Sequence, residues 1–474
     1  MEVRLLLLIV LICLHAAPRR ASAQQPGEAT VIVKGSTRIA ETDENYICAT
    51  IDWWPPEKCN YNQCPWGQSS ILNLDLDHPF LAQAIQGNEL SGHGIGAKVD
   101  AKLYGKDVIE FKSILQQLYK APMSQPLVLA PGGFFDQQWY SQLLQTSGHG
   151  VVDALTHHVY NLGGVCINND TLFSGDDVHL IRKILDPKYL DRAEDTYRDM
   201  QLTIQRHGTW ASAWVSESGG VFNNGGPLVS NAFIDSIWYL DQLGMASKYN
   251  TKVFCRQTLI GGNYGLLDTQ TFLPNPDYYR QGYSYETIKM IQFGDNRQRF
   301  DIYFDHFFWY QCSTMASAYG QWSSFKLDNS VCQITHFTHA YFKMQQGITV
   351  LLINLSNTTG YNVTLQNDIN VSLGKRPDLE KGSSFTHRLR KAVSWLGSKP
   401  SSDTKKREEY HLTTKDGDLQ SKTMLLNGAS LEMGDDGSVP AMDPVLVAID
   451  SPVYIAPTSI AFVVLPKFEA KACS

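Results

Sequence analysis

The 474-residue chain is poor in charged residues, and it has no excess of basic ones. Charged residues make up 18% of the sequence, and 47 acidic side chains outnumber 40 lysines and arginines, for a formal net charge of −7. A protein that binds nucleic acid needs a positive surface, so this balance argues against a nucleic-acid partner. Basic residues within 387–391 and 405–407 could bind another polyanion, although a solvated loop is the simpler interpretation.

Long apolar runs are also absent, apart from one near the N-terminus. The run from Leu5 to Leu14 follows Arg4 and precedes Ala21-Ser22-Ala23, which is the pattern of a secretory signal peptide and its cleavage site. The run is shorter than the roughly 20 apolar residues of a membrane-spanning helix. We expect residues 1–23 to be a signal peptide and the protein to be soluble, and either secreted to the extracellular space or cell wall or sent to the vacuole. A peripheral association with a membrane or the cell wall stays open, as does the oligomeric state.

No set of cysteines and histidines has the spacing of metal ligands. The adjacent His157 and His158 would point to opposite faces of a strand, so they cannot chelate one ion. Eight cysteines follow the signal segment, and secretion favours disulfides. Cys59 and Cys64 are the best local pair, while the other pairings cannot be deduced. Five N-x-S/T sequons fit a glycosylated surface. They begin at Asn169, Asn354, Asn357, Asn362 and Asn370.

Predicted strands and helices alternate from residue 86 to residue 267. The predicted strands cover 127–133, 151–160, 209–217 and 253–267, and the predicted helices cover 100–120, 136–145, 191–206 and 232–247. This alternation is typical of α/β architecture with parallel strands, in which functional residues stand at the carboxyl ends of strands. We therefore predict a parallel α/β domain over residues 24–279.

The pattern changes in the second half of the chain. From residue 347 to residue 474, short strand-like runs separated by turns predict an antiparallel β-sandwich. The stretch 280–346 is an atypical insert, because its aromatic residues are crowded without helix or strand periodicity. It could be an added carbohydrate-binding loop, but an alternatively spliced or mis-joined segment is the favoured interpretation.

Two predicted strand ends present a glutamate beside small residues and glycines. They are Glu89, within Gly87–Gly92, and Glu217, within Trp214–Gly220. Hydrolysis of a glycosidic bond takes two carboxylates, one as acid/base and one as nucleophile or base. The spacing of 128 residues (217 − 89) accommodates three strand–helix units, which would place both at one rim of a barrel. Glu89 alone is as readily an exposed turn residue. The apolar strand residues before Glu217 and the two glycines after it favour a carboxylate held near a cleft, and the pair together favours a hydrolase.

Other strand ends carry further candidate binding residues. Asp52 could bind a sugar hydroxyl or simply cap a turn. His158 and Tyr160 could line the site or form a buried pair. Tyr264, in a glycine-rich segment, could donate to an anionic group of the substrate or pack at a glycine kink.

With these motifs, the sequence resembles the plant heparanase-like proteins of glycoside hydrolase family 79, which are β-glucuronidases and endo-β-glucuronidases. The stretches that carry the resemblance are 48–59, 87–92, 156–163, 214–220 and 261–264. The resemblance implies a (β/α)8 barrel with a β-sandwich, a carbohydrate or glucuronide substrate, and no metal or organic cofactor. It also implies a retaining mechanism with Glu89 as acid/base and Glu217 as nucleophile.

The resemblance assigns the remaining contacts to the sugar. Asn88 would contact the sugar next to the nucleophile, and Asp52 would hold a sugar hydroxyl. Gly262 and Tyr264 would hold the uronate carboxylate. A retaining pair sits about 5–5.5 Å apart. The charge of Glu217 would then raise the pKa of Glu89 and keep its proton on until Glu217 is esterified.

The chain departs from this family between Asp52 and Asn88. These residues are 36 positions apart, whereas the three strand–helix units expected between them need roughly 90 residues. We therefore predict that strands two and three and most of strand four are missing at the Gln86/Gly87 junction, which leaves about six strands. An unclosed parallel sheet exposes two edges. The alternative to an active enzyme is thus a catalytically inactive glycan-binding or misfolded splice variant.

Overall fold

The computed structural model describes residues 25–33, 40–43, 46–50, 99–121, 125–164, 178–222, 225–281, 289–290, 302–304, 347–367, 406–434, 440, 442–466 and 468. Outside these ranges lie the predicted signal peptide, residues 387–391, the cysteines Cys59 and Cys64, the sequons at Asn169 and Asn370, and the predicted site residues Asp52, Asn88 and Glu89. Within them, no helix is both long and apolar enough to cross a membrane.

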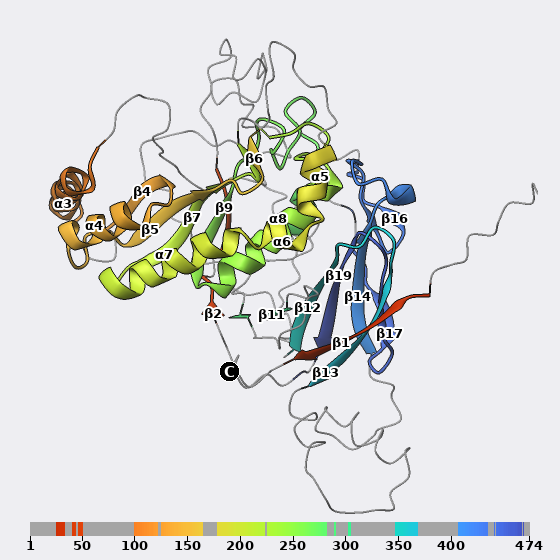
Figure 1. The fold of residues 1–474 in the computed structure, drawn as a ribbon. Coiled ribbons are helices and arrows are strands. Elements are labelled where there is room, and N and C mark those ends of the chain that lie inside the picture. The colour runs from red at the N-terminus through yellow and green to blue at the C-terminus, as the bar shows by residue number, and fades with distance from the viewer. Residues whose placement is uncertain are drawn as a thin grey trace, which may run out of the picture.

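Five parallel strands form the sheet of the first half of the chain (Figure 1). Their order is β3 (Ile47–Ala49), β9 (Thr251–Arg256), β7 (Ser212–Ser218), β5 (Ala154–Val159) and β4 (Leu129–Phe134). Every residue of the interior strand β5 is buried, as expected for a parallel strand covered on both faces. A disulfide links Cys48 of β3 to Cys255 of β9. Sequence reasoning had left this pairing open.

The helices follow the strands much as their apolar periodicity predicts. They are α3 (Ala101–Leu118), α4 (Gln137–Ser147), α7 (Ala193–His207) and α8 (Phe233–Lys248), with the shorter α5 (Val178–Ile184), α6 (Pro187–Leu190) and α9 (Tyr278–Gln281). The side chains of Asp100 and Asp136 cap α3 and α4, because they accept hydrogen bonds from backbone N–H groups of the first turn. The four predicted long helices are confirmed to within three residues at each end.

Two further sheets consist mainly of strands from the second half of the chain, joined by β1 and β2 from its start. The larger has the order β16-β15-β14-β19-β12-β11-β10-β2, with β17 on β14, and the smaller has the order β1-β13-β18. These strands are β1 (Gly27–Val33), β2 (Ala40–Glu41), β10 (Lys289–Met290), β11 (Ile302–Phe304), β12 (Gly347–Asn354), β13 (Tyr361–Asn367), β14 (Lys406–Thr413), β15 (Leu425–Leu426), β16 (Ala429–Ser430), β17 (Val445–Ala448), β18 (Val453–Ile455) and β19 (Ser459–Pro466). One apolar cluster joins the two sheets, with Val363 and Val453 on one side and Val350 and Val463 on the other. The sheets are antiparallel except for β1 and β13.

Three details differ from the sequence predictions. The N-terminal strand β1 pairs with β13, so it belongs to the second group of sheets rather than to the barrel domain, and Val31 and Val33 are buried there. The strand predicted over 253–267 ends at Arg256, and bends and turns follow it, including a left-handed Gly262 with φ of 62°. Arg407 is no part of a basic surface: it is buried and paired with Glu409.

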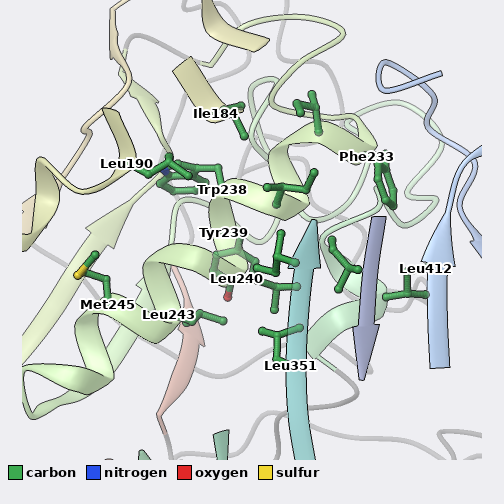
Figure 2. Close-up of a cluster of buried hydrophobic side chains, with 14 of the residues drawn as sticks. Ile184, Leu190, Phe233, Trp238, Tyr239, Leu240, Leu243, Met245, Leu351 and Leu412 are labelled. Carbon is green, nitrogen blue, oxygen red and sulfur yellow. The ribbon is translucent and has the colours of Figure 1, made fainter. Parts of the chain in front are cut away.

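The parallel sheet and the antiparallel sheets share a core around α8. Phe233 and Leu240 of α8 belong to the same buried cluster as Leu351 of β12 and Leu412 of β14 (Figure 2). The backbone N–H groups of Phe233 and Ile234 donate to carbonyl oxygens of residues 421 and 419, at 2.9 and 3.0 Å. These bonds satisfy donors that a helix cannot satisfy within its first turn. The start of α8 is therefore fixed to the segment 419–421.

The two edge strands of the parallel sheet, β4 and β3, have fewer neighbours. Among the described residues, β4 pairs only with β5, and β3 pairs only with β9. Helix α3, which precedes β4, exposes Leu103, Phe111 and Leu118. The described residues do not test whether the sheet closes into a barrel, so closure stays a prediction.

Candidate active site

Three neighbouring strands bring side chains together at their carboxyl ends. In the register of the sheet, Glu217 of β7 pairs with His158 of β5, and His158 pairs with Phe134 of β4. The register shifts just before these positions on both strand pairs. Such irregularities re-aim side chains at the end of a strand and are common beside active sites. Glu217, one of the two predicted catalytic glutamates, thus stands at the edge where parallel α/β enzymes place their chemistry.

The carboxylate of Glu217 has a neighbour on each oxygen. The Tyr160 hydroxyl donates a hydrogen bond to Oε1. The Nδ1 atom of His158 lies 3.6 Å from Oε2, which makes an ion pair only when the imidazole is protonated. The Glu217 side chain is 15% exposed, so it is sheltered but still accessible. His158 of β5 and Tyr160, which directly follows β5, therefore both lie against the Glu217 carboxylate.

The peptide that follows Glu217 is fixed from both neighbouring strands. The hydroxyl of the buried Ser218 donates to the Val159 carbonyl oxygen at 2.8 Å. The Ser218 carbonyl oxygen accepts from the Gln257 N–H at 2.8 Å and from Arg256 Nη1 at 3.5 Å. Ser218 is a positioning residue that the sequence analysis missed, because its role depends on contacts with residues 38 to 59 positions away.

Arg256 is the centre of a buried ionic group behind this strand end. Its Nη2 atom donates to Asp235 at 2.6 Å and to Asp277 at 2.9 Å, and Ser236 donates to Asp277 at 2.6 Å. Burial raises the pKa of Asp235 well above its ordinary value, and although Arg256 opposes this rise, Asp277 adds to it. Burial therefore favours the protonated form of Asp235.

The glycines after Ser218 make room for two tyrosines. A side-chain carbon at Gly219 would lie 2.9 Å from a Tyr264 ring atom and 3.1 Å from a Tyr160 ring atom. Tyr264 is thus brought close to the residue that contacts Glu217, and it is buried. Gly262 lies in the same turn and is partly exposed. The structure therefore gathers four of the predicted site residues, Glu217, His158, Tyr160 and Tyr264, around one strand end.

His157 faces the opposite side of β5, as the alternation of a strand predicts. Its ring lies between those of Phe135 and Tyr197, with centroids 6.3 and 5.9 Å away. Burial lowers the pKa of His157 to about 3, and the neighbouring His158 adds to the effect. His157 is therefore a neutral residue of the core and is not part of the site.

Another contact holds the loop after β5. The indole N–H of the buried Trp238 donates to Asn161 Oδ1 at 2.7 Å. Asn161 directly follows Tyr160, so this bond ties the end of β5 to helix α8. Within the described ranges, no group of three histidine, cysteine, aspartate or glutamate side chains could hold a metal ion.

The described sequons are not equivalent. Asn354 is 5% exposed, and its Nδ2 atom donates to the carbonyl oxygens of Thr359 and Ala456, both at 2.8 Å. A glycan needs this nitrogen at the surface, so the geometry argues against modification of Asn354. Asn357 is exposed, and Asn362 is partly exposed. These two remain predicted glycosylation sites.

Comparison with known proteins finds one family model and several plant relatives that match this chain. The profile described as "Glycosyl hydrolase family 79, N-terminal domain" matches residues 28–87 and 86–244. Heparanase-like protein 2 of Arabidopsis thaliana is 39% identical over 577 aligned positions, covering 98% of this chain and 99% of that protein. Heparanase-like protein 1 of the same plant is 37% identical over 580 positions, covering 99% of both chains. Baicalin-beta-D-glucuronidase of Scutellaria baicalensis is 27% identical, covering 93% of both.

A solved structure is less similar. A 4-O-alpha-L-rhamnosyl-beta-D-glucuronidase from Fusarium oxysporum has a TM-score of 0.46 and 11% identity, covering 78% of this chain and 66% of that one. A likeness at this level carries no argument about the site.

The comparisons also bear on the predicted gap in the barrel. The two profile matches meet at residues 86 and 87, the junction where strands are predicted to be missing. An alignment of 580 positions with heparanase-like protein 1 holds at most 474 residues of this chain, so at least 106 of its positions (580 − 474) are empty here. Both observations support the prediction that this chain lacks a long internal stretch that its relatives contain.

Proposed function

The chain belongs to glycosyl hydrolase family 79, and we propose that it is a secreted or vacuolar retaining glycosidase that cleaves β-linked glucuronic acid from glycans or small glucuronides. Its membership makes it a glycoside hydrolase. The glucuronide specificity is supported by a relative that is named as a glucuronidase. The observation that carries the proposal is the Glu217 carboxylate at the end of β7, with the Tyr160 hydroxyl on one oxygen.

In this mechanism Glu217 is the nucleophile. The hydrogen bond from Tyr160 occupies Oε1 and stabilises the ionised carboxylate, which leaves Oε2 to attack the anomeric carbon. The bond from that carbon to the leaving oxygen breaks as Glu89 donates its proton to the oxygen. The product is a glycosyl ester of Glu217. Glu89, whose role rests on the resemblance, then removes a proton from water, which attacks the ester and restores Glu217.

Tyr264 would recognise the acidic group of the sugar. It lies beside Tyr160, close to the nucleophile, as the Gly219 geometry indicates. A hydroxyl donor at this place would bind the uronate carboxylate, with Gly262 allowing the backbone to approach. Asp52 and Asn88 complete the proposed sugar contacts, while the reaction needs neither metal nor organic cofactor.

The test is hydrolysis of 4-nitrophenyl β-glucuronide by the purified protein and by Glu217→Gln. We expect the substitution to lower kcat by more than about a thousand-fold, because the nucleophile is lost. Glu194→Gln is a matched control: Glu194 also accepts a hydrogen bond from a tyrosine, Tyr249, but lies on α7 away from the site. Full activity of Glu217→Gln would remove Glu217 from the mechanism.

A second experiment separates the roles of the two glutamates. Azide added to Glu217→Gly should restore turnover and yield α-glucuronyl azide, because the azide attacks from the side of the missing carboxylate. Azide added to Glu89→Gly should yield the β-azide, because it attacks the glycosyl ester of Glu217. The opposite assignment of the products would exchange the two roles.

An inactive glycan-binding or misfolded variant is the second candidate, and the empty alignment positions favour it. Thermal unfolding together with glucuronide binding distinguishes the possibilities. A cooperative transition and binding without turnover would indicate a binding protein, whereas the absence of a cooperative transition would indicate a chain that does not fold.

A further inference from the structure

The segment that contains helices α5 and α6 is basic, although the net charge of the chain is negative. Residues 178–192 contain two acidic residues, Asp186 and Asp191, and four basic ones, which are Arg182, Lys183, Lys188 and Arg192. The carboxylate of Asp186 already accepts a hydrogen bond from a backbone N–H group at the start of α6. The segment is therefore a local positive surface, to which the proposed mechanism assigns no role.

Two of these cations contact the same aromatic ring. The Nζ atom of Lys183 lies 5.4 Å from the centroid of the Tyr189 ring, and Cζ of Arg192 lies 4.5 Å from it. The two charges are therefore no more than 9.9 Å (5.4 + 4.5) apart. The attraction of each cation to the ring helps to hold it in place and offsets part of the repulsion between them. The protein thus keeps two like charges close together.

Neither of the two cations is neutralised by a carboxylate. In the part of the chain that the structure describes, no acidic side chain forms an ion pair with Lys183 or Arg192. By contrast, Arg198 on α7 and Lys248 on α8 each pair with an acidic side chain, with nitrogen–oxygen distances of 2.7 Å. Arg192 is exposed, and Lys183 is partly exposed. Their remaining N–H donors can therefore bind an anion from solution.

Lys183 also connects this pair of cations to the loops that leave the candidate active site. Its Nζ atom donates to the Leu162 carbonyl oxygen at 2.7 Å, and the Leu162 N–H donates to the Gly220 carbonyl oxygen at 3.0 Å. Leu162 is two residues after Tyr160, and Gly220 is three residues after Glu217. The cations therefore lie at the end of the parallel sheet that holds the nucleophile.

We propose that Lys183 and Arg192 bind the anionic group of a second acidic sugar, further along a glycan whose glucuronic acid occupies the site at Glu217. The shared chemistry is an anionic oxygen, from either a carboxylate or a sulfate ester, which accepts charge-assisted hydrogen bonds from the ammonium and guanidinium groups. The inference rests on the proposed function, because it makes this ligand a part of the substrate. The enzyme would then prefer acidic glycan chains over neutral ones.

Binding of acidic oligosaccharides that lack glucuronic acid tests this inference without requiring turnover. Isothermal titration at low salt should show that the wild-type protein binds tetragalacturonate more tightly than neutral maltotetraose. Lys183→Gln combined with Arg192→Gln should weaken tetragalacturonate binding about ten-fold, as for the loss of two exposed charge pairs. The matched control is Lys106→Gln combined with Arg206→Gln, which removes the same charge from exposed positions on α3 and at the far end of α7.

Two further arms sharpen the experiment. Sulfated maltotetraose carries sulfate esters instead of carboxylates, so the tighter of the two acidic ligands identifies the anion that the site prefers. Lys183→Arg combined with Arg192→Lys keeps both charges, and it should therefore keep the binding of that ligand.

Equal binding of the acidic and neutral ligands, or an equal loss of binding in the Lys106 and Arg206 control, would overturn the inference. Loss of binding in the charge-conserving variant, with a circular dichroism spectrum like that of wild type, would also overturn it. The proposed function is judged separately, by turnover of 4-nitrophenyl β-glucuronide by wild type and Glu217→Gln, because none of the ligands titrated here is a glucuronide.

Discussion

Helices α8 and α3 differ sharply in how much of their apolar surface the protein covers. Helix α8 lies between the parallel sheet and the antiparallel sheets and is buried along nearly its whole length (Figures 1 and 2). Helix α3 buries only Ala101, Gly105 and Val108. Thr146 of α4 lies close to Gly105, so α3 packs tightly on α4 but on one narrow face.

The difference shows that periodicity predicts a helix, whereas burial depends on which neighbours are present. The exposed apolar residues of α3, among them Leu103, Phe111 and Leu118, form a second face that is not covered by α4. At least 106 positions (580 − 474) of the alignment with heparanase-like protein 1 are empty in this chain. The loss of strands predicted at the Gln86/Gly87 junction would leave this face of α3 without its cover.

The largest effect should come from the buried ionic group around Arg256. Arg256→Leu leaves the carboxylate of Asp277 buried without its partner, which costs about 3–5 kcal/mol of unfolding free energy. Arg198→Leu is the control, since Arg198 also bridges two aspartates, Asp195 and Asp199, but at the surface. Urea unfolding followed by circular dichroism measures both variants. A loss no larger for Arg256→Leu than for Arg198→Leu would mean that the group around Arg256 is solvated.

A pair of leucine substitutions compares the two helices directly. Leu243→Ala on α8 removes a buried side chain and should cost about 2–5 kcal/mol. Leu103→Ala on α3, where the side chain is 51% exposed, should change stability by less than about 0.5 kcal/mol. The same unfolding measurement applies. Equal losses of unfolding free energy in the two variants would contradict the difference between the helices, because they would mean that α3 is covered in solution.

The buried His157 predicts a loss of stability in acid. Its pKa is lowered to about 3 in the folded protein, so below pH 6.5 the unfolded chain binds a proton that the folded chain does not. Stability should therefore fall as pH drops from 6.5 towards 3, by roughly 2 kcal/mol between pH 7 and pH 5. His157→Leu should flatten this dependence, whereas His179→Gln, at an exposed position on α5, should not. An unchanged slope in His157→Leu would assign the effect to other groups.

The smallest predicted effect concerns the support of the nucleophile. Tyr160→Phe removes the hydroxyl that donates to Glu217 and keeps the ring that packs on Phe134. We expect kcat on 4-nitrophenyl β-glucuronide to fall about 10- to 100-fold, as for loss of a hydrogen bond to a charged group. An unchanged kcat in Tyr160→Phe would mean that the hydroxyl gives no support to the nucleophile.

Local patterns in the sequence predicted the elements whose partners are close in the chain. The helices α3, α4, α7 and α8 were recognisable because their apolar residues repeat with helical spacing. The partner of β1 was not, because Gly27 pairs with Tyr361 and no local signal encodes such a contact. The same limit hid the disulfide between Cys48 and Cys255, which are 207 residues apart.

Some residues of the candidate site could be predicted from the sequence, and others could not. Glu217, His158 and Tyr160 could be found because each stands in a short motif at a strand end. Ser218 and Arg256 could not, because their roles arise from hydrogen bonds between neighbouring strands. A lone arginine at the end of the apolar strand β9 was the one available signal of the buried ionic group.

The most direct test of Glu217 as the nucleophile is covalent trapping. The protein is treated with 2-deoxy-2-fluoro-β-glucuronyl fluoride, digested, and analysed by mass spectrometry for the residue that carries the sugar. The predicted result is a glycosyl ester on Glu217, which the Tyr160 contact holds ready for attack. A label on another residue, or no label on a folded protein that turns over glucuronides, would contradict the account.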